Sequence, residues 1–242
     1  MQEIQASLSA LKLGAPQVFR NLAIFPLVSA KDAGAGYVLL DEALERKLAR
    51  VTEVSERGHV PELAFENSSA EKILLVDGDE LVGAKQNRIL NLSVLVAGGA
   101  RVVIPVSVSS SMSDAYAAME RSLGEYVAAF FPELRQCGAV LAIDGRVQGL
   151  ELFDSPSAFA RYFAKLVRGY ALDAVETANG KVLAPPEEEV RRFLERVGAA
   201  AGERFAALGE GEDIRLSGEG LAGGALAAGG RVVHLAAHGV GR

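Results

Sequence analysis

Short apolar segments bounded by turn-forming residues predict a β-rich first half of the chain. They are residues 18–29, 60–67, 71–76, 89–96 and 101–108. We expect Asn21 and Pro26 to interrupt the first of them. The four residues 97–100 (AGGA) suit the loop of a hairpin that joins the last two segments. Pro105 has no backbone N–H to donate, so we expect residues 101–108 to form an edge strand or to contain a bulge.

A period of two residues indicates which face of the last two segments is buried. In residues 89–96 the apolar face consists of Leu90, Leu92, Val94 and Val96. In residues 101–108 it consists of Val102, Ile104, Val106 and Val108. Asn91 and Ser93 fall on the other face of their strand, beside Ile89 and Leu95.

Apolar residues three and four positions apart predict helices, most of them in the second half. They cover residues 41–51, residues 113–130, a segment that begins at Ser155-Pro156 and a segment that begins at Pro185-Pro186. Asp41 is a candidate N-cap for the first helix. Phe205 and Leu208 extend the apolar stripe of the last helix. Between the second and third helices, residues 138–153 read as a β-hairpin, with Asp144-Gly145 suited to a type I′ turn.

The strands and helices do not alternate regularly, which argues against a doubly wound fold. The sequence therefore predicts an α+β fold. We expect a largely antiparallel sheet in the first half and the C-terminal tail, with three to four packing helices. Because there is no obvious linker or internal repeat, we expect residues 1–242 to form a single domain.

Composition narrows the function classes. The net charge of −6 argues against broad binding to nucleic acid or to anionic membranes. The single cysteine, Cys137, excludes an internal disulfide. The sequence shows neither a signal peptide nor an apolar run near the roughly 20 residues of a membrane helix. We expect a soluble cytoplasmic protein without a cofactor. The charge does not exclude a local basic pocket, and self-association stays open.

Two histidines are candidates for a site in the tail. His234 and His238 are four residues apart, a spacing that would bring them together on a helix. Residues 231–239 look more like a strand, in which the two side chains would lie about 13 Å apart at about 3.3 Å per residue. The alternative to a shared metal is a hydrogen-bonded His234, in the core or at the surface, and a His238 in a mobile tail.

Carboxylates are concentrated in residues 77–81 (DGDEL). Asp77, Asp79 and Glu80 could hold a metal or act as general acids and bases, and with His234 they would make a metal-dependent hydrolase. Asp and Gly are also what a solvated turn prefers.

The stretch 83–91 (GAKQNRILN) places long polar side chains between two apolar runs. Lys85 and Arg88 offer positive charge for a phosphate or carboxylate. Gln86, Asn87 and Asn91 offer donors and acceptors for sugar hydroxyls or base edges. The alternative is a structural corner in which these side chains satisfy backbone groups at the end of a sheet.

Residues 77–107 contain a G-[D/E]-E-L-x-G-A-K-Q-N-R core and a following segment that ends in I-P-V-S. They closely resemble a family named for its association with ADP-ribosylglycohydrolases and rhodanese-phosphatases. Residues 60–67, 111–119, 138–153, 170–176 and 232–238 resemble the family in the same order. The resemblance thus extends over about residues 15–238.

One departure from the family follows Val108. In the family this strand usually continues into Cys-Val-Glu and a Gly-Arg-Trp element, whereas here Ser109 follows and the chain has no Trp. If the segment is lost, its Cys, Glu and Arg can take no part in catalysis. If residues are missing from the sequence at this point, they form a loop over the site.

The resemblance implies a link to ADP-ribose or another NAD-derived metabolite. We therefore expect the chain to bind or process an anionic nucleotide-sugar through a polar site around residues 80–91. Glu80 and His234 are then the candidate catalytic residues. The ligand-binding candidates are Lys85, Gln86, Asn87, Arg88 and Asn91. The alternative is a non-catalytic interaction module in which the polar stretch is structural.

Overall fold

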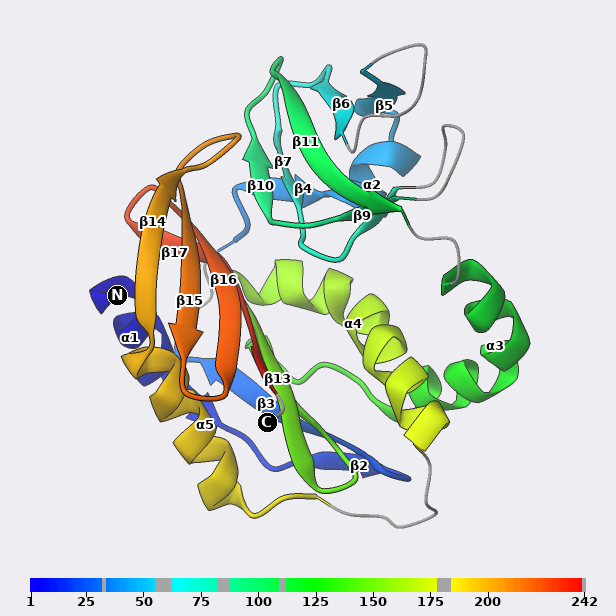
Figure 1. The fold of residues 1–242 in the computed structure, drawn as a ribbon, viewed down its shortest axis with the longest axis vertical. Coiled ribbons are helices and arrows are strands. Elements are labelled where there is room, and N and C mark those ends of the chain that lie inside the picture. The colour runs from blue at the N-terminus through cyan, green and yellow to red at the C-terminus, as the bar shows by residue number, and fades with distance from the viewer. Residues whose placement is uncertain (32–33, 55–61, 82–87, 109–111, 178–183, 241–242) are drawn as a thin grey trace.

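The computed structural model covers the whole chain and confirms the α+β class. It describes residues 1–31, 34–54, 62–81, 88–108, 112–177 and 184–240. Among the strand pairs of these residues, β4 and β7 are parallel and the others are antiparallel. The layers are visible in Figure 1.

A nine-stranded antiparallel sheet forms the larger part of the molecule, and its strands come from both ends of the chain. The order along the sheet is β1 (Leu11–Leu13), β3 (Leu22–Ser29), β12 (Gln136–Ile143), β13 (Arg146–Phe153), β17 (Arg231–Gly239), β16 (Leu221–Ala228), β15 (Glu212–Gly218) and β14 (Ala201–Ala206), with β2 (Gln17–Phe19) also paired to β3. Strand β17 thus lies in the interior of the sheet, where its side chains are buried on both faces.

Helices cover both faces of this sheet. On one face, α1 (Gln2–Ser9) and α5 (Glu187–Ala199) contribute Ile4, Val190, Phe193 and Val197 to the core. On the other, α3 (Met112–Ala129) and α4 (Pro156–Thr177) form an apolar cluster with Phe153 and Leu226 of the sheet. Burial of large apolar side chains on both faces is the main source of stability for such a layered fold.

A smaller β-rich unit packs against α4. Its first layer has β10 (Val94–Val96), β7 (Lys72–Leu75) and β4 (Tyr37–Leu39), followed by the short helix α2 (Leu40–Glu45). Its second layer has β5 (Ala49–Glu53), β6 (Glu62–Asn67), β11 (Arg101–Val108), β9 (Arg88–Leu90) and β8 (Glu80–Leu81). One face of the first layer joins the cluster around α4, and the other face packs on the second layer.

Several local predictions are confirmed. Residues 136–153 form a hairpin, and Asp144 and Gly145 both have the positive φ that a type I′ turn requires (51° and 75°). Helix α4 begins at Pro156, and α3 occupies almost the whole predicted segment. The apolar face of residues 89–96 packs into the core of the smaller unit as expected.

Other predictions are wrong. Residues 97–100 do not join a hairpin, because β10 pairs with β7 and β11 pairs with β6 and β9. Strand β11 stands between β6 and β9 in the strand order, yet each of its paired residues has one partner, on β6 as far as Pro105 and on β9 from Val106. Pro26 does not interrupt β3.

The predicted helix boundaries also need correction. The first helix ends at Glu45 without a side-chain cap from Asp41, and the residues after it form β5. Helix α5 ends at Ala199, so Phe205 and Leu208 lie beyond it and are about half exposed. Five helices occur among the described residues, because α1 was not predicted.

In the described residues, no helix combines the length and the apolar character that crossing a membrane demands.

Candidate functional site

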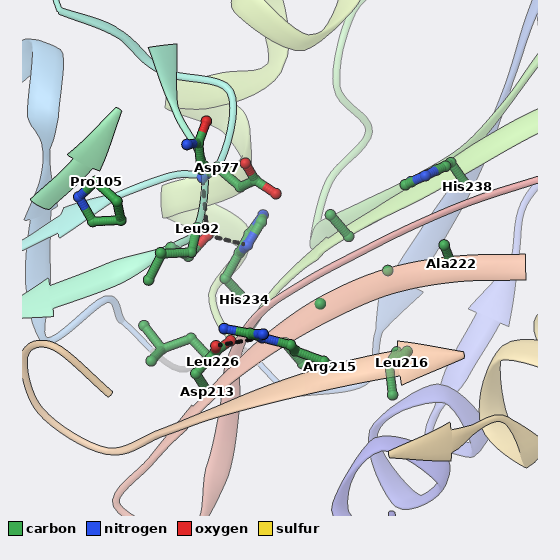
Figure 2. Close-up of a pocket in the computed structure, with 16 residues that line it drawn as sticks. Asp77, Leu92, Pro105, Asp213, Arg215, Leu216, Ala222, Leu226, His234 and His238 are labelled. Atoms are coloured by element: carbon green, nitrogen blue, oxygen red, sulfur yellow. Dashed lines mark hydrogen bonds and ion pairs between the residues drawn. The ribbon is translucent and has the colours of Figure 1, made fainter. Parts of the chain in front are cut away.

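A cavity of about 500 Å³ lies where the smaller β-rich unit meets strands β15, β16 and β17 (Figure 2). This size is within the range of small-molecule sites in proteins. Its polar lining residues are Asp77, Asn91, Ser93, Asp213, Arg215, His234 and His238. Its apolar lining includes Leu92, Pro105, Leu216 and Leu226. The arrangement provides hydrogen-bonding groups beside apolar surface, as ligand sites usually do.

Glycine forms part of the cavity wall on β16. A Cβ atom on Gly223 would lie 2.4 Å from the carbonyl oxygen of Ala236, so no larger residue fits this approach of β16 to β17. Gly224 beside it also lines the cavity. At these two positions the backbone rather than a side chain forms the cavity wall.

His234 is the central residue of the site. It points to the same face of the sheet as Phe153, its cross-strand neighbour, and the two ring centroids are 4.8 Å apart. The side chain is almost fully buried, with 1% of its surface exposed. Its Nε2 lies 2.6 Å from Oε1 of Glu151, and its Nδ1 lies 2.8 Å from Oγ of Ser93.

The neighbouring groups determine which side-chain atoms of Ser93, His234 and Glu151 carry the hydrogens. The backbone N–H of Asp77 donates to Oγ of Ser93 over 3.0 Å, which leaves the hydroxyl hydrogen of Ser93 for another acceptor. An ionised Glu151 can only accept, so Nε2 of His234 carries the hydrogen between them. In a neutral His234, Nδ1 is then an acceptor for the hydroxyl of Ser93.

Asp77 follows strand β7 and exposes its carboxylate in the cavity (Figure 2). Desolvation by the surrounding walls raises the pKa of Asp77 above its ordinary value, although the charge of a protonated His234 would oppose the shift. A carboxyl with a raised pKa in a cavity is a candidate general acid or base.

Arg215 supplies the fixed positive charge of the cavity. Its guanidinium lies 4.6 Å from the centroid of the Phe205 ring, and its Nε lies 3.5 Å from a carboxylate oxygen of Asp213. The side chain is 67% exposed, so it is free to turn towards a ligand. Two carboxyl groups, those of Asp77 and Asp213, accompany Arg215 in the described lining of the cavity.

A buried ion pair holds the segment that carries Asp77. Asp79 accepts a hydrogen bond of 2.8 Å from the backbone N–H of Val76 and lies 2.7 Å from Nζ of Lys165 on α4. Burial raises the pKa of Asp79, and Lys165 opposes that shift. Burial also lowers the pKa of Lys165, but Asp79 and Asp41 more than offset this, so the net shift is upward.

Four candidate residues from the sequence line the cavity: Asp77, Asn91, His234 and His238. The amide oxygen of Asn91 accepts a hydrogen bond from Ser107. Glu80 lies opposite Ile89, on the same face of the sheet as Asn91, but it does not line the cavity.

The side chain of Arg88 points to the opposite face of the sheet from Asn91. It shares the inward face of β9 with Leu90 and is 5% exposed. Its Nε has no hydrogen-bond partner, so the guanidinium is only partly satisfied within the described part of the chain. Lys85, Gln86 and Asn87 lie outside the described residues.

The residues proposed for a metal-dependent hydrolase do not converge. His234 and His238 occupy the predicted strand, with both ring nitrogens of His234 engaged by Ser93 and Glu151. Asp79 is engaged by Lys165. Across the described ranges, no group of three or more His, Cys, Asp or Glu side chains is placed to hold a metal ion.

Sequence reasoning missed Glu151 and Arg215 as members of the site. Glu151 is a charged residue in the otherwise apolar end of the predicted hairpin, where burial was expected, and this was a usable signal. Arg215 has no comparable signal, because alternating polar residues are ordinary in a strand with one exposed face.

Comparison with known protein families gives one match. The sequence model of the ARG and Rhodanese-Phosphatase-superfamily-associated Protein domain matches residues 10–108 and 107–238. The two parts meet at the point where the sequence lacks the Cys-Val-Glu and Gly-Arg-Trp elements expected from the resemblance. Neither the curated proteins nor the solved structures include a significant match.

Proposed function

Because the chain belongs to the ARG and Rhodanese-Phosphatase-superfamily-associated Protein domain family, we propose that it binds an anionic nucleotide-sugar such as ADP-ribose. The binding site in this proposal is the cavity between the smaller β-rich unit and strands β15 to β17. The family name associates the domain with ADP-ribosylglycohydrolases, which supplies the ligand class.

The observation that carries the proposal is the combination of groups on the cavity wall. Arg215 offers a planar cationic fork for a phosphate. Asp77 and Asn91 offer acceptors and donors for ribose hydroxyls. Leu92, Pro105 and Leu226 offer apolar surface for a base. Each part of a nucleotide-sugar therefore has a chemically matched partner in one cavity.

The polar stretch before β9 belongs to the same proposal. Lys85, Gln86, Asn87 and Arg88 would add charge and hydrogen bonds to the phosphates, as the sequence predicts. Arg88 does not line the cavity, because it shares the inward face of β9 with Leu90. Its buried Nε, which has no hydrogen-bond partner among the described residues, would have to turn towards the phosphates to take part. Glu80 and His234 would act on a bound ligand as acid, base or orienting groups.

Calorimetric titration with ADP-ribose, ribose 5-phosphate and adenosine tests the cavity. We expect Arg215→Ala to weaken ADP-ribose and ribose 5-phosphate about tenfold, since a charged hydrogen bond contributes about 1.5 kcal/mol. Adenosine has no phosphate, so its affinity should not change.

Arg192→Ala is the matched control, because Arg192 is an exposed arginine of α5 whose side chain is 62% exposed. It should bind all three ligands like the parent chain. No binding of ADP-ribose or ribose 5-phosphate by the parent chain would contradict the proposal. Equal losses in the two arginine variants would show that the effect is one of net charge.

Self-association is a second candidate function, and one observation favours it. The exposed end of the nine-stranded sheet is β14, all of whose residues are exposed, and Phe205 within it is 42% exposed. Such an edge is a ready template for pairing with another strand. Near Pro105, where we expected an interaction edge, β11 passes from pairing with β6 to pairing with β9. Light scattering should show a dimer that Phe205→Lys dissociates, and a parent chain monomeric at high concentration would exclude it.

A further inference from the structure

Three residues from distant parts of the chain form one continuous hydrogen-bonded row at the cavity. Ser93 precedes β10, His234 lies on β17 and Glu151 lies on β13. Their side-chain contacts are 2.8 Å between Ser93 and His234 and 2.6 Å between His234 and Glu151. Ser93 lines the cavity, whereas Glu151 is not among its lining residues.

The sheet register explains how the row forms. Glu151 lies opposite Ala236, so His234 is its diagonal neighbour on the adjacent strand, within reach of a long side chain. Phe153 packs against the His234 ring and limits its rotation. The backbone N–H of Asp77 fixes Oγ of Ser93 from the other side.

We propose that Ser93 is a nucleophile, with His234 as its general base and Glu151 as the residue that positions and supports His234. A serine within hydrogen-bond reach of a base, which a third group orients, is the arrangement that activates a hydroxyl. Here Nδ1 faces the serine and Nε2 faces the carboxylate. The roles depend on which groups the nitrogens meet, not on their labels.

The reaction that suits this row is hydrolysis of a carboxylic ester. Oγ of Ser93 forms a bond to the ester carbonyl carbon while its proton moves to Nδ1 of His234. The tetrahedral intermediate then expels the alcohol oxygen, which takes that proton, and an acyl-serine is left. Water, deprotonated by Nδ1, attacks the acyl carbon, and Oγ of Ser93 departs with the proton. The free acid and the original serine result.

The nature of the alcohol rests on the proposed function. In a cavity that holds a nucleotide-sugar, the ester is an acyl group on a ribose hydroxyl, beside Asp77 and Asn91. The activated serine itself does not depend on that ligand. The two ideas can therefore fail separately.

Covalent labelling with phenylmethanesulfonyl fluoride tests the serine directly. Oγ of Ser93 would bond to the sulfonyl sulfur, fluoride would leave and the hydroxyl proton would pass to His234. We expect one adduct per chain, located by peptide mass spectrometry on the segment containing Ser93, together with hydrolysis of 4-nitrophenyl acetate.

Three variants define the result. Ser93→Ala should abolish the adduct and reduce ester hydrolysis at least a hundredfold. Ser107→Ala is the matched control, since Ser107 is an exposed serine of β11 whose hydroxyl donates to the amide oxygen of Asn91, and it should label like the parent chain. Glu151→Gln should lower the maximal labelling rate about tenfold or more while the concentration for half-maximal rate stays the same.

Two outcomes would overturn the proposal. One is a folded parent chain, confirmed by its thermal transition, that acquires no adduct at Ser93. The other is ester hydrolysis that persists in Ser93→Ala. ADP-ribose binding without labelling would leave the cavity as a binding site only, and labelling without ADP-ribose binding would reject the ribose ester but retain the serine.

Discussion

Two buried polar clusters lie on the same face of the nine-stranded sheet, and they differ in kind. In the first, Asn21 donates to the carbonyl of Ala174 over 2.9 Å and accepts from the hydroxyl of Tyr126 over 2.6 Å. In the second, Ser93, His234 and Glu151 form the row at the cavity. Both satisfy buried polar atoms, as a stable fold requires.

The two clusters differ in the charged groups they contain and in their access to the cavity. The first cluster joins the amide of Asn21 to a hydroxyl and a backbone carbonyl, and it adjoins no cavity described above. The second contains an imidazole and a carboxyl group and ends at a wall of a cavity of about 500 Å³. A network needed only for packing does not require ionisable members, which are costly to bury. The comparison therefore supports the proposal that the second cluster has a function beyond packing.

The largest expected effect comes from breaking the structural cluster. Asn21→Ala should lower the free energy of unfolding by about 3 kcal/mol, because it leaves the hydroxyl of Tyr126 and the carbonyl of Ala174 without their partner. Urea unfolding measures this. ADP-ribose affinity and Ser93 labelling of the folded variant should not change, and a change in either would remove the distinction between the clusters.

Lys165→Met should have the next largest effect, because Lys165 pairs with the buried Asp79 without lining the cavity. We expect a loss of about 2 kcal/mol at pH 7, less than for a fully buried pair because Asp79 can take up a proton.

The pH dependence of this variant gives the sharper result. The folded-state pKa of Asp79 is already raised by burial, and removal of Lys165 raises it further. A raised carboxyl pKa means that stability is lost as pH rises through the folded-state value. The difference in free energy of unfolding between the parent chain and the variant should therefore be small at pH 4 and largest above pH 7. A difference that is constant with pH would show that Asp79 is not the residue affected.

Local signals made much of the fold predictable. The 136–153 hairpin follows from Asp144-Gly145, and α4 follows from Ser155-Pro156 and its apolar stripe. The prediction that residues 97–100 (AGGA) join a hairpin failed, because turn residues indicate only that the chain reverses and not which strand becomes the neighbour. The actual partner of β10 is β7, which lies earlier in the sequence. Pairing of this kind depends on packing between distant segments.

The candidate site was predictable only where it depends on single residues. His234 and Asn91 were identified by residue type, and both line the cavity. The link from His234 to Glu151 spans 83 positions and arises from the pairing of β13 with β17, which no local pattern specifies. One signal was overlooked: Arg88 and Asn91 are an odd number of positions apart, so an extended chain directs them to opposite faces.

Arg88→Met tests whether the inward-facing arginine takes part in binding. We expect stability to change by less than about 1 kcal/mol, because replacing a partly satisfied buried cation by an apolar side chain is often neutral. We expect ADP-ribose affinity to fall about tenfold, as the loss of one charged hydrogen bond to phosphate would imply. Calorimetric titration against adenosine provides the control. Unchanged ADP-ribose affinity would make Arg88 a residue of the core, comparable to Asn21.

Asp77→Asn should give the smallest effect of these variants. It tests what the Asp77 carboxyl group does in the cavity. The raised folded-state pKa of Asp77 means that its ionised form costs stability as pH rises above about 4. The side chain remains open to solvent in the cavity, so the variant should melt less than about 2 °C higher at pH 7 and no differently at pH 3.5. ADP-ribose should bind the variant slightly less tightly at pH 7, because an amide is a weaker acceptor for the ribose hydroxyls than a carboxylate. Unchanged or tighter binding would show that Asp77 does not hold the ribose hydroxyls.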